Sequence, residues 1–564
     1  MDPIDMMVTD INCEDLGLSR LCLMENAGKC LSDEIATIST FTFSKPVKVA
    51  IFTGSGGNGG DGFVAARNLL NRGFEVELFM LSSSEDIKSI DALINFEILE
   101  NMVPRISRLK IIELKDSTDV ENIEIAKSKS FSEHIIVDGI LGTGIKGKLK
   151  SKVRRTIEVI NESNALKVAI DVPSGMDPLT GEISDIAVKP EYTITFHKVK
   201  TGVKKVSLND SSLVGGLVIC DIGIPIEAEL FVGTGDLLRL SSRDETSHKG
   251  NNGKILIVGG SNDYHGAPAI AGLSAISCGA DLVYIACPQQ ISLAIKQKSP
   301  DLIVKGLTSG NEDYLNLENL NDILKIVEDN DIDSVLLGPG SGQNEETGKL
   351  FNILAKKIEK PLVMDADALK IVDPIVIKNK ENLVITPHLN EFKSFFNDYI
   401  NSNYNYNNNY NNKNYNNYDK YDDKNYNKNG EEEYADSEIS LISSNEEYDY
   451  DKLSEKIAIF QDITNTINGT VVLKGKYDLI FNKRNFRINK NGNSGMTVGG
   501  TGDSLAGIAT SLLSQGLSAY DAGALATYLN GKAGDFAKKV YGNGFTASQL
   551  SEFLGILMEN LDNQ

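Results

Sequence analysis

A strand, a glycine-rich loop, a helix and a second strand follow one another between residues 47 and 81. The apolar segment 47–52 leads into the glycine loop 54–60, which is followed by the helical segment 61–72 and the apolar segment 75–81. Two strands joined through one helix pair in parallel within a sheet. This unit therefore restricts the chain to an α/β fold.

Short apolar segments that end in polar residues or glycine recur along the rest of the chain. They lie at residues 135–137, 167–170, 192–196 and 217–220, and again at 254–258, 281–286, 334–337, 361–364, 382–385 and 470–473. The polar stretch 241–248 separates the two series. Because 564 residues exceed the size at which one core stops growing, we expect two α/β domains, 1–228 and 245–564, joined by a linker at 229–244.

One tract interrupts the second series. Residues 397–451 are dominated first by asparagine and tyrosine and then by acidic residues. A tract this polar cannot bury enough apolar surface to offset the entropy lost on ordering. We therefore predict a disordered insertion within the second domain.

The composition disfavours several classes of partner. A net charge of −22 without a broad basic patch argues against nucleic acid, because its phosphate backbone would be repelled. No apolar run approaches membrane-spanning length, and residues 1–10 lack the basic segment that opens a signal peptide. The six cysteines show no C-x-x-C spacing, which favours free thiols over a zinc site. We expect a cytoplasmic protein without membrane or nucleic-acid partners.

A second glycine-rich loop, residues 495–503, runs directly into the amphipathic helical segment 504–513. Unpaired backbone N–H groups and the positive end of the helix dipole make such a junction a site for anions. Asp503 would lie where a phosphate arrives, which indicates phosphoryl chemistry. The same four letters, Gly-Thr-Gly-Asp, also occur at 233–236, so the tetrapeptide alone predicts only a tight turn before a helix.

The loops that follow strands in the first half carry polar side chains. The glycine loop matches the dinucleotide pattern G-x-G-x-x-G, but no acidic residue closes the second strand to bind a ribose, which disfavours hydride transfer with NAD. Binding of a nucleotide phosphate stays open. Loops at the carboxyl ends of parallel strands converge on one crevice. Four side chains of these loops are expected to meet there: Asn58, Asp138, Asp171 and Ser174.

These motifs resemble the NAD(P)H-hydrate epimerase family. The resemblance rests on the helical segment 23–28, the glycine loop, the segment 138–144 and the segment 171–175. It implies a Rossmann-like fold, a potassium ion held by Asn58, Asp138 and Ser174, and an Asp171 that faces the hydrated nicotinamide ring. All three ion ligands offer oxygen, as a hard cation requires.

The same resemblance implies which residues of this domain bind hydrated NAD(P)H. They are Gly57, Asn58, Gly59, Gly60 and Asp61 in the glycine loop, and Gly142, Thr143, Gly144, Ile145, Lys146, Gly147 and Lys148 around the substrate phosphates. The family loop usually has two adjacent asparagines, and here Gly57 replaces the first. One substrate hydrogen bond is therefore expected to be missing or relocated.

The second series resembles the ADP- or ATP-dependent NAD(P)H-hydrate dehydratase family, which has a ribokinase-like fold. The resemblance rests on residues 249–254, 259–268, 338–342, 365–369, 386–388, 473–475 and 499–503. It implies that Gly340, His388 and Asp503 contact the hydrated substrate. The residues implied to bind the nucleotide are Lys474, Gly475, Lys476, Tyr477, Asp478 and Gly502. If the segment 365–367 is extended, only one of its two aspartates faces the cleft.

The resemblance assigns catalysis to Asp171 in the first domain and to Asp503 in the second. In ribokinase-like enzymes the carboxylate equivalent to Asp503 accepts the proton of the attacking hydroxyl. Phosphorylation of the C6 hydroxyl of the hydrated nicotinamide would then create a leaving group. Its expulsion by the ring nitrogen would restore NADH or NADPH.

Together the two resemblances imply a bifunctional repair enzyme that epimerises hydrated NADH and NADPH (NADHX and NADPHX) and dehydrates the S epimer. ADP, with magnesium, is the expected phosphoryl donor, although ATP stays open, and we expect a homo-oligomer. The alternative is a ribokinase-like small-molecule kinase with a non-catalytic N-terminal binding module. Asp138, Asp171 and Ser174 argue against that alternative, because their loops retain the polar side chains of a site.

Overall fold

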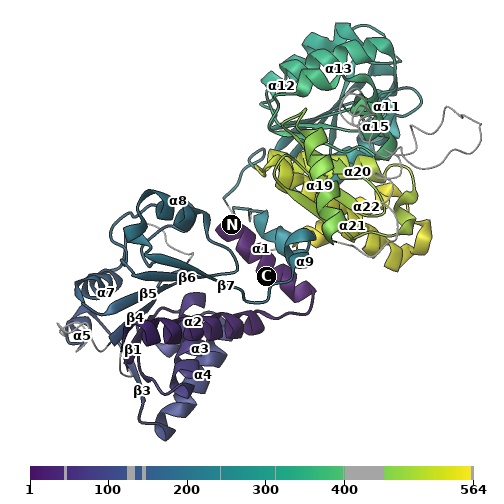
Figure 1. The fold of residues 1–564 in the computed structure, drawn as a ribbon. Helices are drawn as coiled ribbons and strands as arrows, with labels where there is room; N and C mark the ends of the chain where they lie inside the picture. The colour runs from purple at the N-terminus through teal and green to yellow at the C-terminus, as the bar shows by residue number, and fades with distance from the viewer. Residues whose placement is uncertain are drawn as a thin grey trace, which may run out of the picture. The chain divides into compact units, whose positions relative to one another are not determined.

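The computed structural model describes residues 1–43, 47–123, 134–142, 148–241, 243–244, 246–311, 313–397, 399 and 450–559. The chain forms two compact units, Met1–Ala228 and Glu229–Gln564, each built around one sheet (Figure 1). The α/β class predicted from the sequence is confirmed. The predicted disordered insertion lies outside the described residues at 398 and over 400–449, as does the segment 143–147.

The first unit contains a seven-stranded parallel sheet in the order β3-β2-β1-β4-β5-β6-β7. The strands are β1 (Lys48–Thr53), β2 (Glu75–Met80), β3 (Leu109–Glu113), β4 (His134–Gly139), β5 (Leu166–Ile170), β6 (Tyr192–Phe196) and β7 (Gly216–Cys220). The helices are α1 (Pro3–Asp15), α2 (Arg20–Thr42), α3 (Gly57–Asn71), α4 (Ile90–Met102), α5 (Ser117–Glu121), α7 (Ser151–Glu162) and α8 (Thr201–Asn209), and α9 (Ile226–Leu230) follows at the end of the unit.

Helices cover both faces of this sheet. Val49 and Ile51 of β1 pack into a core with α2, α3 and α4, whereas the alternating Ala50 and Phe52 pack into a core with α5 and α7. Strands buried on both faces explain the continuous apolar segments of the sequence. The strand order reverses between β1 and β4, so the loops that follow these two strands border the crevice where ligands bind in open α/β sheets.

The second unit contains a nine-stranded sheet in the order β10-β9-β8-β11-β12-β13-β14-β15-β16, parallel as far as β14 and antiparallel beyond it. The strands are β8 (Lys254–Val258), β9 (Leu282–Pro288), β10 (Leu302–Leu307), β11 (Ser334–Leu337), β12 (Leu362–Met364), β13 (Leu383–Ile385), β14 (Thr470–Leu473), β15 (Asp478–Phe481) and β16 (Phe486–Asn489). The switch in strand order lies between β8 and β11.

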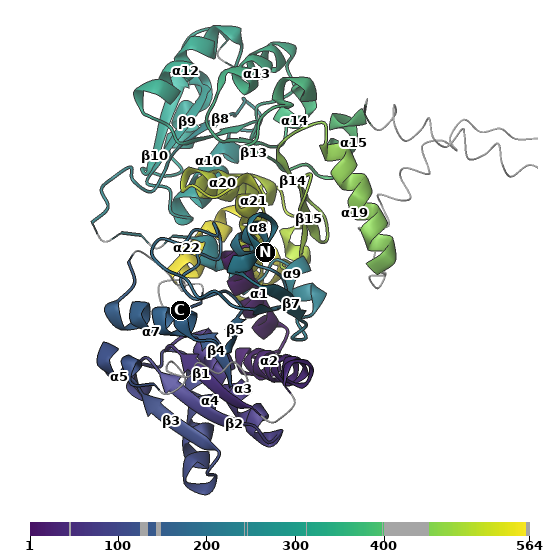
Figure 2. The same ribbon diagram turned by 60° about the vertical axis from the view of Figure 1, so that its left-hand side comes forward.

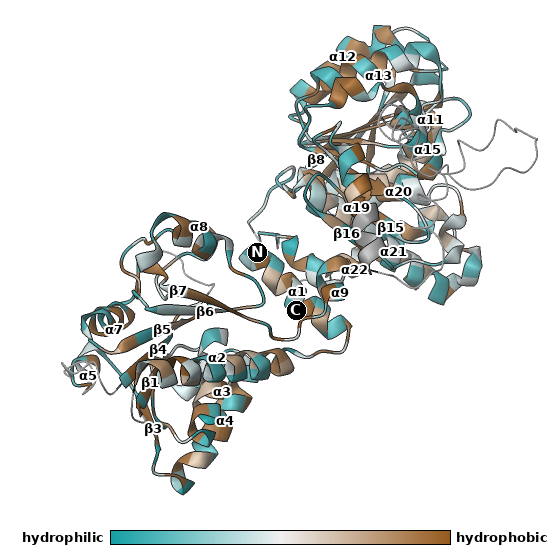
Figure 3. Cartoon of the chain, viewed as in Figure 1, coloured by the Kyte–Doolittle hydropathy of each residue, from teal (hydrophilic) through white to brown (hydrophobic). Residues whose placement is uncertain are grey.

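Two groups of helices sandwich this second sheet (Figure 2). One face is covered by α12 (Leu320–Asp329), α13 (Glu345–Lys357), α15 (Leu389–Phe395) and α19 (Tyr450–Thr464), and α14 (Ala368–Ile371) joins that layer. The other face is covered by α10 (Gly266–Ser277), α11 (Gln289–Lys296), α20 (Thr501–Ser514), α21 (Ala519–Tyr541) and α22 (Leu550–Glu559). Figure 3 shows hydrophilic and hydrophobic residues together on covering helices such as α12 and α13, as expected for helices with one buried face.

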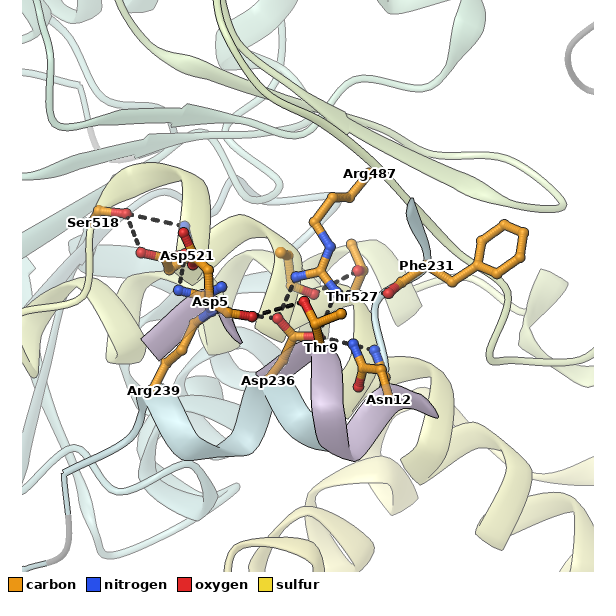
Figure 4. A network of polar contacts seen from close by, with 12 residues as sticks. Asp5, Thr9, Asn12, Phe231, Asp236, Arg239, Arg487, Ser518, Asp521 and Thr527 are labelled. Carbon is orange, nitrogen blue, oxygen red and sulfur yellow. Dashed lines mark hydrogen bonds and ion pairs between the residues drawn. The ribbon is translucent and has the colours of Figure 1, made fainter. Parts of the chain in front are cut away.

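Part of the expected linker is an ordered component of the second unit. The backbone N–H of Val232 donates to the carbonyl of Ile488 at 2.9 Å, which adds this segment to the edge of the sheet beside β16. Asp236, the aspartate of the earlier Gly-Thr-Gly-Asp copy, is fully buried, and Arg487 donates to both of its carboxylate oxygens, at 2.7 Å for Oδ2 (Figure 4). Burial opposes ionisation of Asp236, but Arg487 outweighs it and holds the pKa below its ordinary value. This copy therefore stabilises the fold.

The expectation that all cysteines are free thiols is wrong for two of them. Cys30 of α2 and Cys220 of β7 form a disulfide across 190 residues of sequence, and their Cα atoms lie 6.2 Å apart. No sequence spacing could reveal this pair, because only the packing of α2 against the sheet brings the two residues together. Burial raises the pKa of the Cys278 and Cys287 thiols, so neither is a reactive thiolate. No helix in the described ranges is both long and apolar enough to cross a bilayer.

Candidate active sites

A tight turn after β1 leads into the first turn of α3, which places Asn58 at the carboxyl end of the sheet. A Cβ at Gly59 would lie 2.3 Å from the carbonyl oxygen of Gly54, so only glycine allows this tight turn. The Asn58 amide nitrogen donates to the carbonyl of Ile170 at 2.8 Å and to that of Leu141 at 3.4 Å. Asn58 therefore links the loops that follow β1, β4 and β5.

Asp138 and Ser174 form a buried pair beside Asn58. The Ser174 hydroxyl donates to Asp138 Oδ1 at 2.6 Å, and the Ser174 backbone N–H donates to Oδ2 at 2.8 Å. Burial raises the pKa of Asp138 to about 6 although these hydrogen bonds oppose the rise. In the described part of the chain, no basic side chain pairs with Asp138. Among the described residues, the carboxylate is thus surrounded by uncharged polar groups.

The backbone of Leu141 bridges Asn58 and Ser174, two of the three predicted ion ligands. Its backbone N–H donates to the Ser174 hydroxyl at 2.8 Å, and its carbonyl accepts from Asn58. Within the described residues no cluster of three or more His, Cys, Asp or Glu side chains is placed to hold a metal. An ion here would depend on amide, hydroxyl and carbonyl oxygens together with the single carboxylate, a donor set that suits a hard monovalent cation.

Asp171 follows β5 in an uncommon backbone conformation, with a φ of 63°. Its Oδ1 accepts from the Thr195 hydroxyl at 2.8 Å, from the Phe196 backbone N–H at 3.3 Å and from the ammonium of Lys200. Lys200 is 2% exposed and was not predicted. The sequence indicates Lys200 only by its position shortly after the carboxyl end of a strand, β6. Left-handed backbone in a non-glycine residue is typical of functional sites.

The other residues predicted to bind substrate in this unit lie near the start of α3 or in the segment 142–148, part of which is outside the described residues. A Cβ at Gly57 would meet no atom within 4 Å, so the missing asparagine leaves open space. Burial, and then the charge of Asp171, raise the pKa of Asp61 well above its ordinary value. Gly60 is buried, Gly142 packs against Asn58, and Lys148 is exposed. Thr143, Gly144, Ile145, Lys146 and Gly147 lie outside the described residues.

In the second unit the predicted anion site is the first turn of α20. Gly500 precedes the helix with a φ of 100°, which favours glycine, and Gly502 and Asp503 follow within the turn. Burial raises the pKa of Asp503 to about 7, and the negative charges of Asp365 and Asp367 add to the rise. No described residue donates a hydrogen bond to its carboxylate.

Lys474 connects three loops beside this turn. Its ammonium lies 2.7 Å from Asp365 Oδ1, and its backbone N–H donates to the carbonyl of Pro387 at 2.8 Å. The expectation that only one of Asp365 and Asp367 serves the cleft required an extended segment, and the segment is not extended. Ala366 has a φ of 53°, so the chain turns and the alternation of an extended strand does not apply. Both carboxylates act on Asp503.

His388 caps the helix α15. Its Nδ1 accepts from the backbone N–H of Glu391 at 3.2 Å, and its Nε2 lies 3.4 Å from Glu391 Oε1. The side chain is 52% exposed, which leaves its outer edge accessible to a ligand. Gly340 has a φ of 61° in the loop after β11, where a Cβ would lie 2.4 Å from the carbonyl oxygen of Tyr264.

The predicted nucleotide segment 474–478 is a turn that closes on itself. The Gly475 N–H donates to Asp478 Oδ1 at 3.2 Å, and the Asn489 amide donates to Oδ2 at 3.1 Å. Burial raises the pKa of Asp478 to about 6. Lys476 places its ammonium 5.3 Å from the ring centroid of Tyr477. Both oxygens of Asp478 and the backbone N–H of Gly475 are thus hydrogen-bonded within the chain.

Comparisons with known proteins identify both units. Residues 20–202 match the family described as YjeF-related protein N-terminus, and residues 255–421 and 440–555 match the NAD(P)H-hydrate dehydratase family. The bifunctional NAD(P)H-hydrate repair enzyme Nnr of Methanothermobacter thermautotrophicus is 42% identical over 99% of this chain and 95% of its own. That of Archaeoglobus fulgidus is 36% identical over 97% and 96%. A ribokinase-like superfamily protein of Enterococcus faecalis is 21% identical over 58% of this chain and 94% of its own, with a TM-score of 0.42.

The family assignment rests on the two sequence matches and on relatives that span nearly the whole chain. The predicted order, a Rossmann-like domain followed by a ribokinase-like domain, is confirmed. The chain therefore belongs to the bifunctional NAD(P)H-hydrate repair enzymes, in which an epimerase and a dehydratase share one polypeptide.

Proposed function

We propose that residues 1–228 epimerise hydrated NADH and NADPH at C6 and that residues 245–564 dehydrate the S epimer with a nucleoside phosphate. The observation that carries the dehydratase half is the buried Asp503 in the first turn of α20, beside the ion pair of Lys474 and Asp365. Coupling the two activities is chemically sensible, because a stereospecific dehydratase alone would leave half of a racemised pool unrepaired.

In this proposal Asp503 removes the proton of the C6 hydroxyl while the N–H groups of the turn stabilise the transferring phosphoryl group. A pKa of about 7 suits that role, because a general base works best when its pKa lies near the working pH. The phosphorylated hydroxyl would then leave as phosphate, expelled by the electron pair of the ring nitrogen, and loss of a proton from C5 to solvent would re-form the C5–C6 double bond. Lys474 and the bare backbone of Gly475 and Gly502 would face the phosphates of the nucleotide.

We propose ADP, with magnesium, as the phosphoryl donor, as the resemblance to bacterial and archaeal members of the family implies. Magnesium would neutralise the phosphate charges in such a transfer. Gly340 and the exposed edge of His388 are proposed to contact the hydrated substrate.

For the epimerase half we propose that Asn58, Asp138 and Ser174 hold potassium and that Asp171 faces the nicotinamide ring. A buried carboxylate without a basic partner in the described chain, surrounded by oxygen donors, supports the ion. Potassium would supply positive charge next to the substrate. The backbone of the glycine loop, residues 57–61, and Lys148 are proposed to meet the rest of the substrate.

The proposal is tested by following the recovery of NADH absorbance from purified S-NADHX with ADP and then with ATP. We expect recovery to be faster with ADP and to require magnesium. A stable phosphorylated product without NADH would instead identify a small-molecule kinase.

A further inference from the structure

The carboxylate of Asp171 is held on one side only. Oδ1 accepts three hydrogen bonds, from Thr195, Phe196 and Lys200, whereas Oδ2 accepts none from the described residues. A carboxylate oxygen with three donors has no lone pair left for a ligand. The unoccupied Oδ2 is therefore the atom of Asp171 that can meet a substrate.

Lys200 is the charged member of this anchor. The side chain is 2% exposed, and among the described residues its ammonium donates, besides Asp171, only to the carbonyl of Phe196, at 3.2 Å. A buried ammonium is unfavourable without an anion, and a buried carboxylate is unfavourable without a cation, so each of the two groups offsets the cost of burying the other.

The backbone orients this pair from two strands. Asp171 follows β5 and His197 follows β6, and both have left-handed φ values, 63° and 62°. The Asp171 N–H donates to the carbonyl of Ile194 at 2.7 Å, and the His197 N–H donates to that of Cys220 at 2.7 Å. Two adjacent turns of this kind aim Asp171 and Lys200 at each other from the carboxyl ends of neighbouring strands.

We infer that Lys200 is a positioning residue for the epimerase: it anchors Asp171 through Oδ1 in the ionised form, so that Oδ2 accepts a hydrogen bond from the C6 hydroxyl of the hydrated nicotinamide. This inference rests on the proposed epimerase function of the first unit. Lys200 itself stays behind the carboxylate, away from the reacting atoms.

Other titratable groups share this environment, and they affect the pH dependence. They are Asp10 of α1, Asp61 of α3, His197 after β6, Arg20 at the start of α2 and the amino group of Met1, which donates to the carbonyl of Val199 at 2.8 Å. Lys200 lowers the pKa of both Asp10 and Asp61, against the larger effect of burial. Removal of its charge would therefore make Asp10 and Asp61 harder to ionise.

The test compares Lys200→Met with Lys200→Arg and with the control Lys204→Met, a substitution of an exposed lysine on α8. Conversion of one purified NADHX epimer into the other is followed by chromatography over a range of pH, and thermal unfolding followed by circular dichroism reports on the fold of the same preparations. For Lys200→Met we expect kcat to fall on the order of 10²-fold, because misplaced groups cost about that much, with KM little changed. The limb on which kcat rises with pH should also move to higher pH. Lys200→Arg should restore part of the kcat and part of the original pH profile.

If Lys200→Met has the kcat and the pH profile of Lys204→Met, the inference is wrong. If Lys200→Met does not fold, Thr195→Val removes one neutral donor to Oδ1 and should shift the profile in the same direction by less; an unshifted profile then overturns the inference. A parent protein without epimerase activity would contradict the proposed function instead, so the two failures are distinguishable.

Discussion

Lys474 places its ammonium 2.7 Å from Asp365 Oδ1, and Gly502 lies against this ion pair. A Cβ on Gly502 would be 3.3 Å from the Lys474 ammonium and 3.8 Å from Asp365 Oδ2, so glycine allows the first turn of α20 to approach both charges. Asp503 is the next residue. Burial sets most of the rise in its pKa to about 7, and the charge of Asp365 is the next largest cause.

Replacement of Asp365 should shift the pH dependence of the dehydratase. Asp365→Asn removes a negative charge and leaves Lys474 unpaired, and both effects favour the ionised form of Asp503, so its pKa should fall below about 7. The rising limb of kcat/KM against pH should then move to lower pH. Asp367→Asn should move it in the same direction by less. An unmoved limb, or one that moves up, would show that Asp503 is not the titrating base.

Potassium should support the epimerase through Asp138. The parent protein should epimerise NADHX faster in potassium than in sodium, and Asp138→Asn should weaken that preference because the carboxylate supplies the only negative charge among the three proposed ligands. The measurement is epimerisation rate against the concentration of each cation. Equal rates in sodium and potassium for the parent protein would refute the ion assignment.

Gly57→Asn should restore a substrate contact. The position is open, with no atom within 4 Å of a Cβ, so an asparagine fits at the start of α3 without displacing a neighbour. We expect the KM of the epimerase for NADHX to fall by about two- to tenfold, the value of one hydrogen bond at about 0.5–1.5 kcal/mol. Gly57→Ala is the control for helix propensity. If both variants change KM equally, the side-chain amide makes no contact.

Arg487 should be important for the stability of the second unit. Arg487→Met leaves the buried Asp236 with only the longer contact to Arg239, at 3.4 Å, and loss of one member of a buried pair costs about 3–5 kcal/mol. Because the pKa of Asp236 is lowered in the folded state, the stabilisation is present at neutral pH and is lost as the pH falls through that lowered pKa. Urea unfolding of the parent and the variant measures the loss. Lys349→Met, which removes only exposed ion pairs, should have little effect.

The sequence predicts the central strands of both sheets well, because strands buried on both faces are continuous apolar segments. It misses β3, β10, β15 and β16, which lie at or next to the sheet edges. Edge strands carry charged and small residues, such as Lys305 and Gly306 in β10, that interrupt the apolar pattern.

The residues of the candidate sites also divide into those that the sequence predicts and those that it misses. Asn58, Asp138 and Ser174 are predictable because parallel strands bring their carboxyl-end loops together. Lys200 is not, since it lies 29 residues beyond Asp171 and reaches it only through the left-handed turn at His197. The effect of both Asp365 and Asp367 on the pKa of Asp503 likewise accompanies the turn at Ala366, which no residue pattern encodes.

The most direct measurement of the central claim is NADH recovery from an equal mixture of R- and S-NADHX with ADP and magnesium, with epimer composition followed in parallel. The parent protein should recover all of the NADH. Asp171→Ala should stop near the half that begins as the S epimer and continue only as fast as the epimers interconvert spontaneously, whereas Asp503→Ala should recover none and still interconvert them. Loss of both activities from either substitution, in protein that remains folded, would contradict two independent sites in one repair enzyme.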